Sequence, residues 1–126
     1  MKALIDYFVK EFKSFRHAFR GLGFLASDHN YYFHFPVGIF ILLLGWWFGV
    51  SKEEWLWLIL GVGLVWITEA LNTAIEKAID LVHPQQHPLA GKVKDIAAAA
   101  VLLSVFVSGT IGVIVFYPYF MKFFGL

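Results

Sequence analysis

The sequence contains no cysteine and little charge, and both absences narrow the classes of protein to which it can belong. Without cysteine the chain forms no disulfide, thiolate nucleophile or cysteine-based metal site. Charged residues make up 15% of the 126 residues, whereas 60% are hydrophobic. A soluble protein of this length cannot bury so much apolar surface. A soluble helical bundle is the alternative, but the long uncharged runs described below favour a membrane protein.

Several patterns of known catalytic and binding proteins are also missing. The chain has no Walker loop, kinase catalytic-loop signature, zinc motif or nucleophile elbow. Ten basic residues balance nine acidic ones, so no overall positive field favours nucleic acid as a partner. Charged and apolar residues alternate at the start, and we expect no cleavable signal peptide. Any kinase activity must therefore lie outside the common soluble kinase families.

Residues 1–26 are predicted to form an amphipathic helix. Five apolar side chains recur at alternating steps of four and three, which places them on one face. They are Phe8, Phe12, Phe15, Phe19 and Leu22. A basic helix with such a stripe suits the membrane interface, and packing on the chain's own bundle is the alternative. Arg16 and Arg20 fit contacts with phosphate or lipid headgroups, although an interfacial position alone also explains them.

Three segments with few or no charges are predicted to cross the membrane as helices. They cover residues 33–50, 55–82 and 96–116. The first is about 27 Å long as a helix, roughly one hydrocarbon core, with Pro36 in its first turn. Ser51 is the expected N-cap of the second helix, and Pro84 is expected to end it. In the third, the small residues Ser104, Ser108 and Gly112 suit close helix contact.

The basic residues predict how the chain is oriented in a bacterial inner membrane. Five of the ten precede the first span, and three more flank the polar connection of residues 83–94. The N-terminus and this connection should therefore be cytoplasmic, and the C-terminus should lie outside. Four tryptophans surround the opposite turn, as expected of an aromatic belt at the outer interface.

The end of the second span carries polar side chains at a depth where they are costly. Residues 67–80 read ITEALNTAIEKAID, and four polar residues fall within an arc of about 80° on a helix. They are Glu69, Asn72, Glu76 and Asp80. Counted from the outer interface, Glu69 lies at lipid depth, Glu76 at the inner boundary and Asp80 in water. Such a cluster near lipid usually marks a functional site.

The different depths of these acidic side chains in the membrane suit them to different chemical roles. A carboxylate with little water around it is suited to taking a proton from a lipid hydroxyl. A shallower carboxylate can hold Mg²⁺, which prefers oxygen ligands and keeps several waters or phosphates. Lys94 and Asp95 are expected at the N-terminus of the third span, where they suit a phosphate, and Asp95 is also a natural N-cap. The pattern predicts a polyphosphate, a metal and a membrane substrate.

Three alternatives compete with this interpretation of the polar residues. In the first they have only structural roles: an intramembrane glutamate can be purely structural, Asp80 and His83 can be solvated or capping residues, and His34 is expected to be structural. In the second the chain is a small proton-coupled cation transporter, which explains Glu69 but leaves the remaining acidic residues and Lys94 without a role. In the third it is a non-catalytic scaffold that uses only the small-residue faces.

Two blocks of the sequence resemble the signature of the small bacterial diacylglycerol kinase family, which includes undecaprenol kinases. The first block is EALNTAIE, residues 69–76, with Asp80 four residues further on. The second is HPLAGKVKDIAAAA, residues 87–100. Their spacing fits the family, and the amphipathic start plus three spans extends the resemblance over nearly the whole chain. The HPL segment slightly favours the undecaprenol kinase branch.

The resemblance implies a homotrimeric membrane lipid kinase that uses Mg-ATP, with active sites shared between subunits. Its substrate would be a lipid alcohol, diacylglycerol or undecaprenol, phosphorylated at the cytoplasmic face. On the family pattern Glu69 is the general base, Asn72 supports the site, and Glu76 binds the metal. The residues implied around the nucleotide are Glu76, Asp80, His87, Lys94 and Asp95.

The family also has a glutamate just before the first span as a second metal ligand. If residue positions are matched to the family pattern backwards from Asn30 and His34, Asp28 falls at the position of that glutamate. If they are matched forwards from Gly21, His29 falls there instead. Asp28 is chemically the better ligand for Mg²⁺ because it offers carboxylate oxygens. Its side chain is shorter than that of glutamate and would shift the metal slightly.

Overall fold

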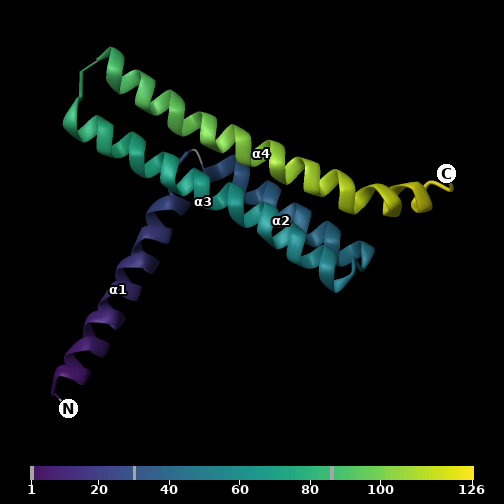
Figure 1. Ribbon diagram of the computed structural model, residues 1–126, viewed down its shortest axis with the longest axis horizontal. Coiled ribbons are helices and arrows are strands. Elements are labelled where there is room, and N and C mark those ends of the chain that lie inside the picture. Colours follow the sequence, from purple (N-terminus) through teal and green to yellow (C-terminus); the bar gives the residue numbers. More distant parts are fainter. Residues whose placement is uncertain (1, 30, 86) are drawn as a thin grey trace.

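A computed structural model describes residues 2–29, 31–85 and 87–126, without the side chains of residues 2, 3, 6 and 9 (Figure 1). Its four helices are α1 (Lys2–Ala26), α2 (Tyr31–Phe48), α3 (Lys52–Val82) and α4 (Pro88–Phe123). By length and composition, α2, α3 and α4 can each cross a membrane. The predicted fold class, an all-α membrane protein with an N-terminal helix and three transmembrane helices, is confirmed.

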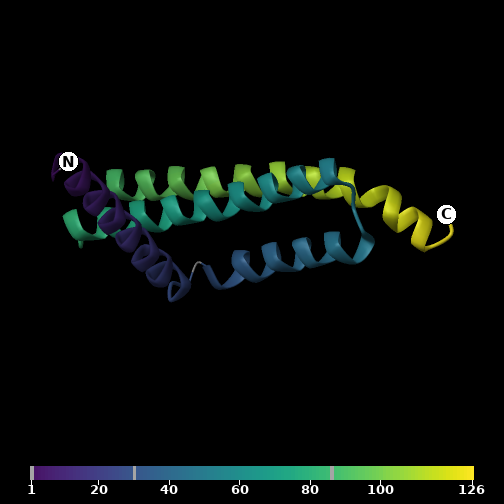
Figure 2. The ribbon, with the colours of Figure 1, turned by 90° about the horizontal axis from the view of Figure 1, so that it is seen from below.

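The three long helices are arranged so that α3 has a neighbour on two sides. α3 and α4 lie side by side and antiparallel, while α2 packs on α3 and lies further from α4 (Figure 2). α1 leaves the bundle at an angle partway along α3, in the half of α3 that leads to the connection with α4 (Figure 1). The α1–α2 turn, the end of α3 and the start of α4 therefore all lie toward one end of the molecule, which we call the inner end.

Capping interactions fix the turn between α2 and α3. Gly49 has a φ of 63°, a left-handed conformation that glycine adopts without strain, and α2 ends just before it. The Glu54 N–H donates to Ser51 Oγ at 3.3 Å, and the Ser51 N–H donates to Glu54 Oε2 at 2.7 Å. This reciprocal capping box confirms Ser51 as the N-cap. α3 then runs to Val82, two residues before Pro84.

Two predicted helix starts were wrong. α2 begins at Tyr31, so Pro36 lies in the second turn and not in the first. α4 begins at Pro88, and the His87 side chain accepts a hydrogen bond at its N-terminus. Asp95 is therefore the eighth residue of α4 and does not cap it. The reason is local, because proline is well suited to the first helical position and starts the helix about two turns earlier.

Small and hydroxylated residues line the contact between α3 and α4. Ser104 is buried, and its Oγ lies 2.8 Å from Thr68 Oγ1. A Cβ at Gly61 would lie 3.1 Å from Ser108 Oγ, so the two helices are close at this level. The predicted close contact is confirmed for Ser104 and Ser108. A Cβ at Gly112 would meet no described atom within 4 Å.

The hydrophobic core lies at the end of the bundle opposite the inner end, which we call the outer end. Its buried members come from the α2–α3 turn, α3 and α4, and they are Val50, Leu58, Val115 and Phe116. Tyr119 of α4 donates its hydroxyl hydrogen to Glu54 Oε2 at 2.6 Å, beside the capping box. The outer end is thus closed by packing and hydrogen bonds, whereas polar groups gather at the inner end.

The aromatic stripe of α1 is exposed and is not covered by the bundle. Phe12 is 78% exposed and Phe19 is 71% exposed. The alternative in which this stripe packs on the chain's own bundle was therefore wrong. An exposed apolar stripe on a basic helix suits a position in the membrane interface.

Trp66 of α3 fixes the position of α2 along the axis of α3. Its ring stacks on Phe35 with the ring centroids 4.7 Å apart, and its Nε1–H donates to the His34 carbonyl at 3.2 Å. The ring lies directly against Gly38, where an added Cβ would come within 2.7 Å of the indole. Only a residue without a side chain fits there.

We therefore expect Gly38→Ala to lower the free energy of unfolding by about 1–3 kcal/mol, because the methyl group displaces the indole. Gly63→Ala is the matched control, since a Cβ there meets no described atom within 4 Å. Thermal unfolding in detergent micelles measures both variants. Equal melting temperatures for the two would contradict the proposed fit of Trp66 against Gly38.

Candidate active site

One face of α3 buries polar side chains near the inner end. Glu69 is 4% exposed, Asn72 is 6% exposed and Thr73 is 4% exposed. Asn72 Nδ2 donates to Glu76 Oε1 at 3.0 Å, one helical turn further along. The 3.6-residue period places these groups on one side of the helix, as the sequence indicates.

Glu69 has a partner that the sequence did not reveal. His34 Nδ1, from α2, lies 2.6 Å from Glu69 Oε1. The imidazole of His34 carries positive charge only when it is protonated, and in that form it would offset the negative charge of the Glu69 carboxylate. Sequence analysis assigned His34 a structural role, because no pattern within one helix indicates which residue of α2 lies opposite Glu69.

The turn between α1 and α2 brings Asp28 to the same face. Asp28 Oδ2 lies 2.7 Å from Lys77 Nζ, and Lys77 directly follows Glu76 in α3. His29 is exposed and lies edge-on to Tyr32. Of the two residues that sequence counting offered, Asp28 therefore has its carboxylate beside the acidic face.

A polar cavity of about 490 Å³ lies where α3 ends and α4 begins. Its polar lining residues include Asp80, His83, His87 and Lys94. Lys94 Nζ forms an ion pair with Asp80 Oδ1, and the rings of His83 and His87 stack with centroids 5.2 Å apart. Asp95 is exposed on α4 and does not line this cavity. The structure thus brings Asp80, His87 and Lys94 together and leaves Asp95 beside them.

The residues on the acidic face fit a magnesium ion by their chemistry. Asp28, Asn72 and Glu76 offer oxygen atoms, which Mg²⁺ prefers. Asn72 Oδ1 and Thr73 Oγ1 are buried and have no hydrogen-bond partner among the described residues. Within the described part of the chain, no three His, Asp or Glu side chains form a metal site alone. Mg²⁺ does not need such a group, because it keeps several water or phosphate ligands.

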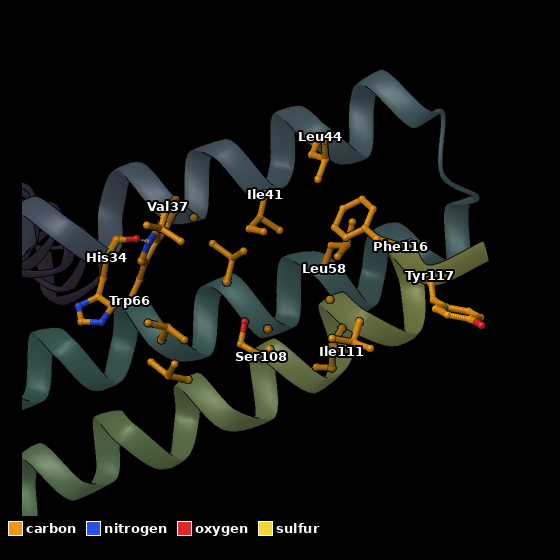
Figure 3. A pocket seen from close by; sticks show the side chains of 18 of the residues that line it. His34, Val37, Ile41, Leu44, Leu58, Trp66, Ser108, Ile111, Phe116 and Tyr117 are labelled. Atoms are coloured by element: carbon orange, nitrogen blue, oxygen red, sulfur yellow. Dashed lines mark hydrogen bonds between the residues drawn. The ribbon is translucent and has the colours of Figure 1, made fainter. Parts of the chain in front are cut away.

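An apolar cavity of about 530 Å³ lies between α2, α3 and α4 (Figure 3). His34 and Trp66 stand at one end of it, and Phe116 and Tyr117 stand at the other. Because His34 also contacts Glu69, the inner end of this cavity reaches the acidic face. The site therefore adjoins a space lined by hydrocarbon on one side and a polar cavity on the other.

A buried carboxylate between hydrocarbon and a polar, oxygen-rich site defines a class: a helical membrane protein equipped for chemistry on a membrane substrate. The chain belongs to the prokaryotic diacylglycerol kinase family, whose sequence profile matches residues 16–116. The match includes α2, α3 and every proposed site residue.

Individual relatives agree with this assignment. The chain is 40% identical to the undecaprenol kinase of Bacillus subtilis (strain 168) over 108 residues, which cover 85% of this chain and 88% of that protein. It is 38% identical to the diacylglycerol kinase of Escherichia coli (strain K12) over 74 residues, covering 56% of this chain and 61% of that protein. Over 101 residues it is 35% identical to the diacylglycerol kinase of Synechocystis sp., covering 79% of this chain and 58% of that protein.

The family assignment decides between the functions that the sequence left open. The chain is a lipid kinase, a phosphotransferase with ATP as co-substrate. The transporter hypothesis receives no support from these relatives. The assignment does not by itself give the lipid, the metal or the role of each residue.

Proposed function

We propose that the chain transfers the γ-phosphoryl group of Mg-ATP to the hydroxyl of a lipid alcohol, preferably undecaprenol, at the cytoplasmic face of the bacterial inner membrane. The observation that carries this proposal is the buried Glu69, on the same helix face as Asn72 and Glu76. Glu69 precedes Asp80 by eleven residues, roughly 16 Å along the helix axis. One helix face thus leads from hydrocarbon to the polar cavity.

Glu69 is the general base in this scheme. Its carboxylate takes the proton of the lipid hydroxyl while the hydroxyl oxygen attacks the γ-phosphorus and ADP leaves. Burial removes water that would compete with the lipid for the phosphoryl group. Asn72 supports the site by donating to Glu76, which orients the Glu76 carboxylate.

Glu76 and Asp28 are the proposed metal ligands. These carboxylates would hold Mg²⁺, which would supply positive charge to offset that of the phosphate oxygens. The Asp28 carboxylate already lies beside Lys77, the residue after Glu76, so the α1–α2 turn and α3 hold both carboxylates at the inner end. Two carboxylates are enough for an ion that retains water and phosphate ligands.

The nucleotide is assigned to the inner end, with Asp80, His87, Lys94 and Asp95. Lys94 supplies positive charge for the phosphates, and its ion pair with Asp80 holds it in the cavity before ATP arrives. His87 lies in the lining of the same cavity. Asp95, exposed on α4 next to Lys94, is placed to contact the part of the nucleotide that projects from the cavity.

The apolar cavity between α2, α3 and α4 suits the hydrocarbon chain of the lipid. Its lining is almost entirely apolar, and its inner end carries His34, the partner of Glu69. A chain held there would present its hydroxyl at the acidic face. The HPL segment and the extent of the match to an undecaprenol kinase both support a long isoprenoid alcohol.

A lipid panel tests the reaction and its substrate. Protein in detergent micelles is incubated with radiolabelled ATP and with undecaprenol, diacylglycerol or ceramide. We expect label in lipid only when Mg²⁺ is present, and about tenfold higher kcat/KM for undecaprenol, or about 1.4 kcal/mol of transition-state discrimination. Equal turnover of diacylglycerol would contradict the choice of lipid, and absence of label with every lipid would contradict the proposed reaction.

The base assignment predicts that Glu69→Gln lowers kcat by about 10²- to 10⁴-fold, because the amide cannot accept the hydroxyl proton. Binding of Mg-ATP and the melting temperature should change little, since glutamine has nearly the same shape. Glu53→Gln is the control, because Glu53 is exposed at the outer turn. Wild-type turnover in the Glu69→Gln variant would remove Glu69 from the base role.

The active assembly is proposed to be a homotrimer with sites shared between subunits, N-termini in the cytoplasm and C-termini outside. Large apolar side chains remain exposed along α4, including Ile96, Leu103 and Phe106, and such faces suit lipid or another copy of the chain. The basic residues concentrate in α1 and around the α3–α4 connection, which supports a cytoplasmic inner end.

Subunit mixing tests the shared site. Glu69→Gln and Asp95→Asn subunits are each expected to be inactive alone. If one site takes Glu69 and Asp95 from different chains, reassembly of an equal mixture should restore about one quarter of wild-type activity, since that fraction of sites receives both intact residues. No recovery above either variant alone would place both residues in the same chain's site.

A further inference from the structure

We propose that His34 is a positioning residue for Glu69: its imidazole, in direct contact with the carboxylate, keeps that group ionised and oriented as a base. The proposal rests on the proposed role of Glu69 and adds a second group from another helix. It is carried by three observations, namely the distance between the two side chains, the burial of Glu69 and the way in which α2 is fixed to α3.

The two side chains are in direct contact. His34 Nδ1 and Glu69 Oε1 are 2.6 Å apart. This is the distance of an ion pair when the imidazole is protonated, although Nδ1 makes no hydrogen bond of regular geometry with a described residue. The imidazole therefore limits the positions open to the Glu69 carboxylate, and in its protonated form it also offsets the charge of that carboxylate.

The burial of Glu69 shows why such a partner is needed. A carboxylate that is 4% exposed loses most of its hydration, and without a partner the neutral acid would be favoured. Glu76, Asp28 and the Tyr31 hydroxyl are the other titratable groups that act on it, and none of them is a cation. Lys77 is engaged by Asp28. His34 is therefore the group that can hold Glu69 in its anionic form.

The backbone of His34 is held in place independently of this contact. Its carbonyl accepts the Trp66 Nε1–H, and Trp66 is seated against Gly38 and stacked on Phe35. The His34 side chain itself remains 25% exposed and lines the inner end of the apolar cavity. The imidazole is thus fixed against Glu69 on one side and reaches the proposed path of the lipid on the other.

The pH dependence of kcat tests this role with two substitutions. His34→Leu removes the donor, and His34→Asn keeps an uncharged N–H donor close to the position of Nδ1. We expect His34→Leu to lower kcat at neutral pH by about tenfold or more and to move the acidic limb of the pH profile to higher pH. His34→Asn should restore part of the rate and return the limb toward its wild-type position, with KM for ATP unchanged in both variants.

His17→Gln is the control, because His17 is exposed on α1 and should leave the profile unchanged. Glu69→Gln in the same assay separates the two proposals. If Glu69→Gln is inactive while both His34 variants keep the wild-type profile, the role of His34 is wrong and the proposed reaction stands. If Glu69→Gln is active, the base assignment fails first, and the role of His34 fails with it.

A measurement on ¹⁵N-histidine protein avoids dependence on the folding of the His34 variants. Removing the carboxylate in Glu69→Gln should change the ¹⁵N chemical shifts of the His34 ring and leave those of His17 in place. Unchanged His34 signals would overturn the proposed contact even if the kinetic variants lose activity through misfolding.

Discussion

The structure depends on the contact between a buried carboxylate of α3 and a histidine of α2. Glu69 is 4% exposed and has little access to water, and His34 of α2 lies 2.6 Å away. That contact requires α2 at one particular level along α3. Trp66 sets the level by fitting against Gly38 and donating to the His34 carbonyl. A packing contact in the hydrocarbon region therefore determines the chemistry of the acidic face.

α3 joins two environments that the reaction must bring together. Its Glu69 contacts His34, which lines an apolar cavity, and its Asp80 lines a polar cavity some three turns further on. A lipid hydroxyl and a nucleotide can thus approach from opposite sides, while the lipid chain stays in hydrocarbon and the nucleotide stays in water. The antiparallel return of α4 adds Lys94 to the polar end, and the α1–α2 turn adds Asp28. The outer end is closed by Glu54 and Tyr119 and serves to hold the helices together.

Features with a local cause could be predicted well. Hydropathy marks the three long helices, because each must be apolar over the thickness of a bilayer. The Ser51 capping box and the shared face of Asn72 and Glu76 follow from spacings of three and four within one helix. The start of α4 was misplaced because two local signals compete there. Pro88 at the first helical position prevails over Asp95 as a cap.

The sequence by itself determined the membrane class, the helix content and the order of polar groups along α3, since each depends on the period and hydropathy of a single segment. Tertiary structure alone decided that His34 faces Glu69 across 35 residues of sequence, that Asp28 rather than His29 reaches α3, and that Lys94 meets Asp80. These pairings depend on the rotation and axial level of one helix against another. That arrangement is set by how side chains such as Trp66 and Ser104 pack between helices, and no pattern within one helix specifies it.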